Sequence, residues 1–105
     1  MWALVAKRSP AISAAVAGER QMNMTTYHVG DIVNWLLGSI TREAYFIGNL
    51  ALDPEGRVLV LATAAEVGIE IEARDCHTTG RGSPGHGTEY RQRYARQRPG
   101  RLRNL

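Results

Sequence analysis

Hydrophobic residues concentrate in the middle of the chain, where two apolar runs flank a short polar turn. The first run is Ala-Tyr-Phe-Ile-Gly-Asn-Leu-Ala-Leu at residues 44–52, and the second, at residues 57–63, is Arg-Val-Leu-Val-Leu-Ala-Thr. Between them, Asp53 can bond its own backbone, Pro54 presets φ, and Gly56 accepts the positive φ that closes a turn. The pattern therefore predicts a β-hairpin over residues 44–63.

Both strands of this hairpin carry apolar residues on both faces. On the first strand, one face would carry Tyr45 and Ile47, and the other would carry Phe46, Leu50 and Leu52. Strands that are buried on both faces have this pattern. We therefore expect the curl of the sheet to cover one face of the hairpin, and a helix or a second chain to cover the other.

One further strand is predicted on each side of the hairpin. Residues 32–37, Ile-Val-Asn-Trp-Leu-Leu, form a short β-prone run. Asp31 as an N-cap and Gly38 beyond the end would also fit a two-turn helix, so the helix stays open as an alternative. Residues 67–73 alternate apolar and polar side chains, which is typical of a strand with one buried face.

These strands together predict a mainly β or α+β domain over residues 25–75, arranged as a four-stranded antiparallel meander or a small barrel. The Gly-Asp-Ile-Val run at residues 30–33, before Trp35 and a hairpin, resembles SH3-like barrels. The same run is similar to the opening strand of toxin ribonucleases of the MazF type. The resemblance implies an SH3-like barrel and, as a third candidate function, a small ribonuclease or toxin-like protein.

The two ends of the chain differ from this domain in composition. Residues 1–24 are Ala-rich, and they form either a leader or a short helix at about residues 11–17, with Ser9 as its cap and Pro10 in its first turn. Such a helix is the one that could pack on the hairpin. After the last strand the sequence is rich in Gly, Ser, Thr and Arg, which predicts a disordered tail over residues 76–105.

Charge is divided unevenly between the domain and the tail. Residues 1–75 carry six Lys or Arg against nine Asp or Glu, whereas residues 76–105 carry seven Arg against a single Glu. The net charges of −3 and +6 give the total of +3. Such asymmetry is typical of an interaction tail on an acidic body, and the planar guanidinium of arginine suits recognition of phosphate.

The first function that we predict is non-enzymatic binding of nucleic acid by this tail. Arginines would contact phosphates while two tyrosines stack on bases, and a helix over residues 88–98 would become ordered on the polyanion. The predicted binding residues are Tyr90, Arg91, Arg93, Tyr94, Arg96, Arg98, Arg101 and Arg103. The chain has no zinc-finger, homeodomain or RRM signature, so RNA and DNA both remain open as targets.

The alternative function is protein interaction or self-association, with the tail serving only as a solubiliser. Trp35, Tyr45 and Phe46 lie near the edge of a small core, and interfaces favour large aromatic side chains. Their partner would be a second copy of the chain, in a homodimer, or an acidic protein.

No catalytic, metal or cofactor site is predicted. The sequence has no nucleophile elbow, P-loop, HExxH or CxxC motif, and Cys76, His77 and His86 lack the spacing of zinc-ligand pairs. A single cysteine fits a reducing cytoplasm, and no apolar run reaches the length of a transmembrane helix. We therefore expect a cytoplasmic protein without a membrane span.

Overall fold

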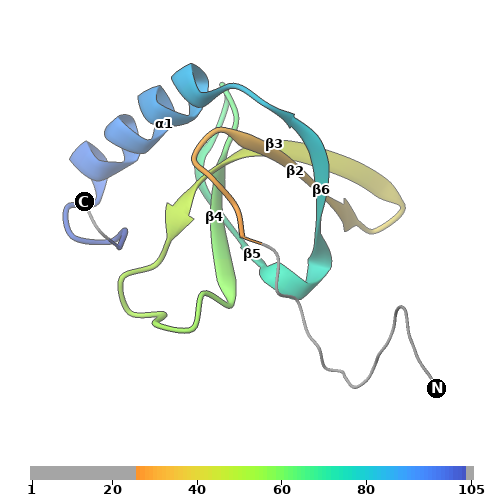
Figure 1. Cartoon of the computed structure of the whole chain (residues 1–105), viewed down its shortest axis with the longest axis horizontal. Helices are drawn as coiled ribbons and strands as arrows, with labels where there is room; N and C mark the ends of the chain where they lie inside the picture. The colour runs from red at the N-terminus through yellow and green to blue at the C-terminus, as the bar shows by residue number, and fades with distance from the viewer. Residues whose placement is uncertain (1–25, 104–105) are drawn as a thin grey trace.

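The computed structural model describes residues 26–103, and within that range the chain forms one antiparallel sheet with a helix on it (Figure 1). The elements in chain order are the strands β2 (Asp31–Leu37), β3 (Ile40–Asn49), β4 (Val58–Ala62) and β5 (Val67–Glu72), the 3-10 turn η2 (Ala73–Asp75), the strand β6 (Cys76–Gly82) and the helix α1 (Pro84–Gln97). The fold is mainly β, as predicted, but this range holds five strands where four were expected. The predicted N-terminal helix or leader lies outside the described residues.

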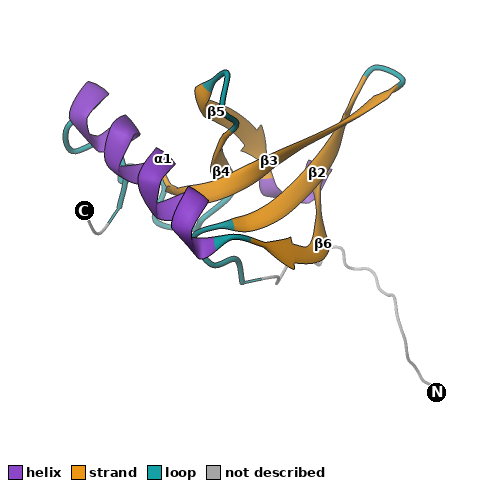
Figure 2. Cartoon of the chain, turned by 90° about the horizontal axis from the view of Figure 1, so that it is seen from above, coloured by secondary structure: helices purple, strands orange, loops and turns teal. Residues whose placement is uncertain are grey.

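The strands lie in the order β5-β4-β3-β2-β6, and every neighbouring pair is antiparallel. From β2 to β5 the sheet is a meander, as predicted, because each strand pairs with the next. The chain then passes through η2, and β6 pairs with β2 at the opposite edge (Figure 2). Since only the three residues of η2 join the two edge strands, the sheet must curl strongly, yet it is not closed into a barrel.

The predicted hairpin over residues 44–63 is confirmed. Strands β3 and β4 pair antiparallel, with Phe46 opposite Leu61. In the turn that joins them, the Asp53 carboxylate accepts a hydrogen bond from the Val58 N–H at 2.8 Å, and Gly56 has a φ of +68°. Asp and Gly therefore stabilise the turn through the local chemistry that the sequence indicates.

A β-bulge in β3 changes which side chains share a face. The register of pairing with β4 shifts between Phe46 and Gly48, so Ile47 is the extra residue. Beyond the bulge, Leu50 packs with Ile47 and not with Phe46, while Leu52 is 93% exposed. The predicted common face of Phe46, Leu50 and Leu52 is therefore wrong, because a bulge interrupts the strict alternation of a strand.

Buried side chains form two clusters, one on each side of the sheet. The curl-side cluster contains Val33, Trp35, Ala44, Phe46, Leu59, Leu61 and Cys76. The helix-side cluster contains Ile47, Val60, Ala62, Tyr90, Tyr94 and Leu102. The curl of the sheet and a helix thus cover the two faces as expected, but the covering helix is α1, far along the chain from the predicted residues 11–17.

The prediction of a disordered tail over residues 76–105 is wrong for the part that the structure describes. Residues 76–82 pair with β2 as β6, and residues 84–97 form α1. The face of β3 and β4 away from the curl is apolar, so its removal from water stabilises the fold. Tyr90 and Tyr94, one helical turn apart, provide the apolar stripe that covers it.

Residues 32–37 form a strand and not the alternative helix. The strand β2 has partners on both sides, with Ile32 opposite Tyr45 of β3 and Asn34 opposite His77 of β6. Pairing on both sides satisfies its backbone donors and acceptors, which a short helix with exposed ends cannot do as completely.

Candidate nucleic-acid interface

The start of α1 is held tightly against the start of β2. Ser83 is the N-cap, and its hydroxyl accepts a hydrogen bond from the His86 N–H at 3.4 Å, while Pro84 is the first helical residue. The Ser83 N–H donates to the Gly30 carbonyl oxygen at 2.9 Å. Gly87 packs directly on Gly30, because a Cβ atom at Gly87 would lie 2.3 Å from the Gly30 nitrogen. The helix is therefore fixed on the sheet at this end.

The two predicted stacking residues belong to the helix-side cluster. Tyr94 is only 5% exposed, and its ring lies on Gly68, where a Cβ atom would be 2.6 Å from the ring. Tyr90 is also buried and packs on the Tyr45 ring at a centroid distance of 5.8 Å. Neither tyrosine can stack on a nucleic-acid base without leaving the core.

Arg91 holds the C-terminal arm, which we define as residues 98–103, against the sheet. Its Nη1 donates to the Ile47 carbonyl oxygen at 2.6 Å, and its Nη2 donates to the Arg103 carbonyl oxygen at 3.0 Å. The backbone N–H of the half-buried Arg103 donates to the Asn49 carbonyl oxygen, and Leu102 is buried. Burial lowers the pKa of the Arg91 guanidinium, as expected for a cation partly removed from water. Arg91 therefore has a structural role.

Two further arginines of the predicted site are paired with carboxylates. Arg93 lies 3.4 Å from Glu89 and over the Tyr90 ring at 5.5 Å. Arg101 donates to Glu70 of β5 at 3.1 Å, and this hydrogen bond raises the pKa of Arg101. Both ion pairs lie at the surface, where such pairs are weak, so a phosphate could displace either carboxylate.

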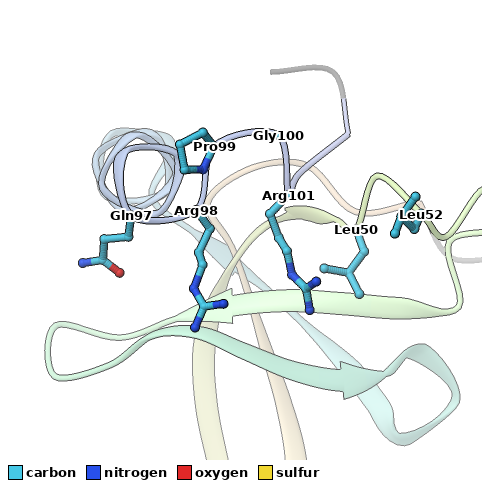
Figure 3. Close-up of a pocket in the computed structure, with 7 residues that line it drawn as sticks. All are labelled: Leu50, Leu52, Gln97, Arg98, Pro99, Gly100 and Arg101. Atoms are coloured by element: carbon cyan, nitrogen blue, oxygen red, sulfur yellow. The ribbon is translucent and has the colours of Figure 1, made fainter.

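Arg96 and Arg98 are exposed and have no carboxylate partner within residues 26–103. Arg96 neighbours Arg93 on the helix surface, because the two are three residues apart. Figure 3 shows that Arg98 and Arg101 extend to the same side of a cleft beside the end of α1. This cleft has a volume of about 400 Å³ and is lined by Leu50, Leu52, Gln97, Arg98, Pro99, Gly100 and Arg101. We call Arg93, Arg96, Arg98 and Arg101 the basic strip.

The predicted interaction residues lie mostly in the core. Trp35 and Phe46 belong to the curl-side cluster, and Tyr45 is half-buried and packs against the rings of Tyr90 and His86. The large apolar side chains that the structure exposes are instead Leu36, Leu37, Ile40 and Leu52. For Leu36 and Leu37 the signal was present in the sequence, because two adjacent leucines at the end of a strand point to opposite faces of the sheet.

Side chains with catalytic or metal-binding chemistry make only local contacts. Within residues 26–103, no three His, Cys, Asp or Glu side chains come close enough together to hold a metal ion. The exposed His28 ring lies 3.8 Å from the Asp31 carboxylate, three residues along the chain. Ser83 Oγ lies 2.8 Å from His86 Nδ1 as part of the helix cap. We assign neither pair a catalytic role.

Cys76 should react very slowly with thiol reagents in the native protein. Burial, together with the charge of Asp75, raises the pKa of its thiol from 9.0 to about 11. At pH 8 the reactive thiolate is therefore about a hundredfold rarer in the native than in the unfolded protein. The rate of modification by a disulfide reagent, with and without urea, measures this difference, and equal rates would contradict the burial of Cys76.

The same thiol gives the stability a defined pH dependence. Because the native pKa is higher than the unfolded value, the neutral thiol contributes stability that is fully present below about pH 9 and is lost as the pH rises towards 11. The free energy of unfolding in urea should fall more steeply over this range in the wild type than in Cys76→Ala.

Comparisons with known proteins identify no relative, since no family model, curated protein or solved structure matches this chain. Over residues 26–103, no helix combines the length and the hydrophobicity that crossing a bilayer requires.

Proposed function

We propose that this protein is a non-enzymatic accessory protein that binds nucleic acid through the basic strip. The observation that supports this function best is that Arg96 and Arg98 are exposed and have no carboxylate partner in the described part of the chain. Arg93 and Arg101 lie near them along the chain and pair with carboxylates at the surface. A nucleic-acid backbone offers closely spaced phosphates to these cations, and the release of its counterions favours binding.

Binding would depend on phosphate contacts and not on bases. Arginine can hold a phosphate through two parallel hydrogen bonds, whereas the buried Tyr90 and Tyr94 leave no stacking platform next to the strip. Phosphate contacts position a protein on a nucleic acid but carry no sequence information. The proposed activity is therefore sequence-independent binding of RNA or DNA, in the cytoplasm, where the free thiol of Cys76 would stay reduced.

The double variant Arg96→Gln/Arg98→Gln should bind oligonucleotides more weakly and with a smaller dependence on salt. Each phosphate contact contributes about −0.9 to the slope of log affinity against log salt for duplex DNA and about −0.7 for single strands. Loss of two contacts should reduce the size of this slope by about 1.4 to 1.8. Fluorescence anisotropy with labelled RNA and DNA of unrelated sequences, at several salt concentrations, measures the slope.

The matched control is Arg57→Gln/Arg74→Gln, which removes the same charge from two exposed arginines outside the basic strip. This control should keep most of the affinity and the slope of the wild type. Equal losses in the two double variants would indicate a dependence on net charge alone and would contradict the basic strip. A wild-type protein that binds anionic lipid vesicles but neither RNA nor DNA would contradict the choice of ligand.

A second function, protein interaction, is favoured by a separate observation. Leu36, Leu37 and Ile40 expose large apolar side chains together at the tip of the β2–β3 hairpin. Large contiguous apolar patches are uncommon on monomeric proteins and often mark interaction sites. The basic strip uses none of these residues, so one chain could have both functions.

A further inference from the structure

The face of the β2–β3 hairpin that carries the curl-side cluster extends beyond this cluster to the end of the hairpin. Its side chains follow the strand register in three layers, which are Val33 opposite Ala44, Trp35 opposite Arg42, and Leu37 opposite Ile40. The first layer and Trp35 belong to the curl-side cluster, whereas Leu37 is 58% exposed and Ile40 is 62% exposed. Two large apolar side chains thus lie side by side in solvent, in line with the buried core.

The hairpin projects beyond the rest of the sheet in both views (Figures 1 and 2). Its turn stands apart from α1 and from β5. Leu36 lies on the opposite face of the same tip and is 66% exposed. The tip, which we define as residues 36–40, is therefore open to a partner from more than one side.

Arg42 adds a positive charge beside this apolar surface. Its guanidinium carbon lies 5.9 Å from the centroid of the Trp35 ring, which is within the range of a cation–π interaction. Arg42 is half-buried and makes no ion pair with a carboxylate of residues 26–103. Five arginines of residues 26–103 pair with a glutamate, namely Arg57, Arg74, Arg81, Arg93 and Arg101, whereas Arg42, like Arg96 and Arg98, does not. The cation next to the tip is thus left for a carboxylate from elsewhere.

We propose that the hairpin tip docks an acidic segment of another protein, in which leucine-like side chains are flanked by aspartate or glutamate. Leu37 and Ile40 would pack on the apolar side chains, and Arg42 would pair with a carboxylate. The complementarity of charge selects this partner, because a two-fold contact between two copies of the tip would bring two Arg42 cations together. This function is additional to nucleic-acid binding and uses a separate surface.

The test uses the full chain and two short dye-labelled peptides. In one peptide leucine alternates with aspartate and glutamate, and in the other asparagine and glutamine replace the acids. By fluorescence anisotropy, the acidic peptide should bind at least about tenfold more tightly than the neutral one. Leu37→Ser/Ile40→Ser and Arg42→Gln should each weaken binding of the acidic peptide by about tenfold, and Arg42→Lys should restore most of the loss.

Two control variants separate the tip from other surfaces. Leu52→Ser alters an even more exposed leucine on the β3–β4 turn, and it should leave the affinity unchanged. Arg96→Gln/Arg98→Gln should also bind the acidic peptide like the wild type, so this result is independent of the outcome with nucleic acid. Circular dichroism establishes that each variant is folded, which we expect because the altered side chains of the tip are exposed.

Several outcomes would overturn the proposal. Equal affinity for the two peptides, or unchanged binding by Arg42→Gln, would exclude an acidic partner at this tip. A loss of binding only in Arg96→Gln/Arg98→Gln would show that the peptide binds at the basic strip and not at the tip. Absence of binding at millimolar peptide would also exclude the proposal. So would a wild-type dimer, detected by light scattering, that Leu37→Ser/Ile40→Ser converts to a monomer.

Discussion

Replacing Gly87 with alanine should destabilise the protein by about 3 kcal/mol or more, measured as the free energy of unfolding in urea. A Cβ atom at this position would lie 2.3 Å from the Gly30 nitrogen and 2.4 Å from the Gly30 Cα. Both are backbone atoms, so no rotation of a side chain can relieve the clash. The start of α1 would have to move away from β2, and the hydrogen bond from the Ser83 N–H to the Gly30 carbonyl would weaken.

Gly85→Ala is the matched control for this substitution, because it adds the same methyl group to the same turn of the helix. A Cβ atom at Gly85 would meet nothing within 4 Å. Alanine is the better helix former, so Gly85→Ala should stabilise the protein by up to about 1 kcal/mol. If Gly87→Ala were tolerated as well as Gly85→Ala, the close packing of α1 on Gly30 would be wrong.

Tyr94→Ala should lower the melting temperature by more than about 10 °C. The ring is buried in the helix-side cluster and lies against Gly68, so its removal leaves a cavity. Truncation of a buried aromatic side chain costs about 3 to 5 kcal/mol, and a domain of this size loses about 4 to 8 °C for each kcal/mol. Thermal unfolding followed by circular dichroism measures the shift.

Two further variants make this result specific. Tyr94→Phe keeps the packed ring and should retain most of the stability, whereas Arg96→Ala alters an exposed side chain of the same helix and should change it by less than about 0.5 kcal/mol. If Tyr94→Ala lowered the affinity for RNA but left the melting temperature unchanged, Tyr94 would be a surface stacking residue and its place in the core would be wrong.

Local chemistry was sufficient to predict the β3–β4 hairpin. Asp53 and Gly56 act on atoms a few residues away, so the turn can be recognised from the sequence. The bulge cannot be predicted in this way, because it depends on distant parts of the chain. At Gly48, a Cβ atom would lie 2.6 Å from the Arg91 guanidinium, which comes from α1.

The sequence predicts a helix over residues 88–98 but not its order in the free protein, because the apolar stripe of this helix is narrow. Its buried residues are only Gly87, Tyr90 and Tyr94, in a segment rich in Arg and Gln. Such a helix is marginal when isolated in water. It is stable here because the sheet provides the surface on which it packs, including glycines at residues 30 and 68.

The candidate site could be predicted only as a set of arginines. Their positions are visible in the sequence, but their availability depends on partners elsewhere in the fold. Arg101 meets Glu70 of β5, and Arg91 meets a carbonyl group of the β3 bulge. The sequence therefore predicts the charge of this region, but which of its arginines are accessible to a ligand depends on the fold.

The helix-side cluster also has a consequence for synthesis on the ribosome. Strands β2 to β5 leave the ribosome before α1 and the C-terminal arm, which contribute Tyr90, Tyr94 and Leu102 to that cluster. Until these residues emerge, Ile47 and Val60 of the nascent sheet lack their partners. An apolar face of this kind is a target for chaperones and a starting point for aggregation. The protein is thus most vulnerable in the interval between the synthesis of its sheet and that of its helix.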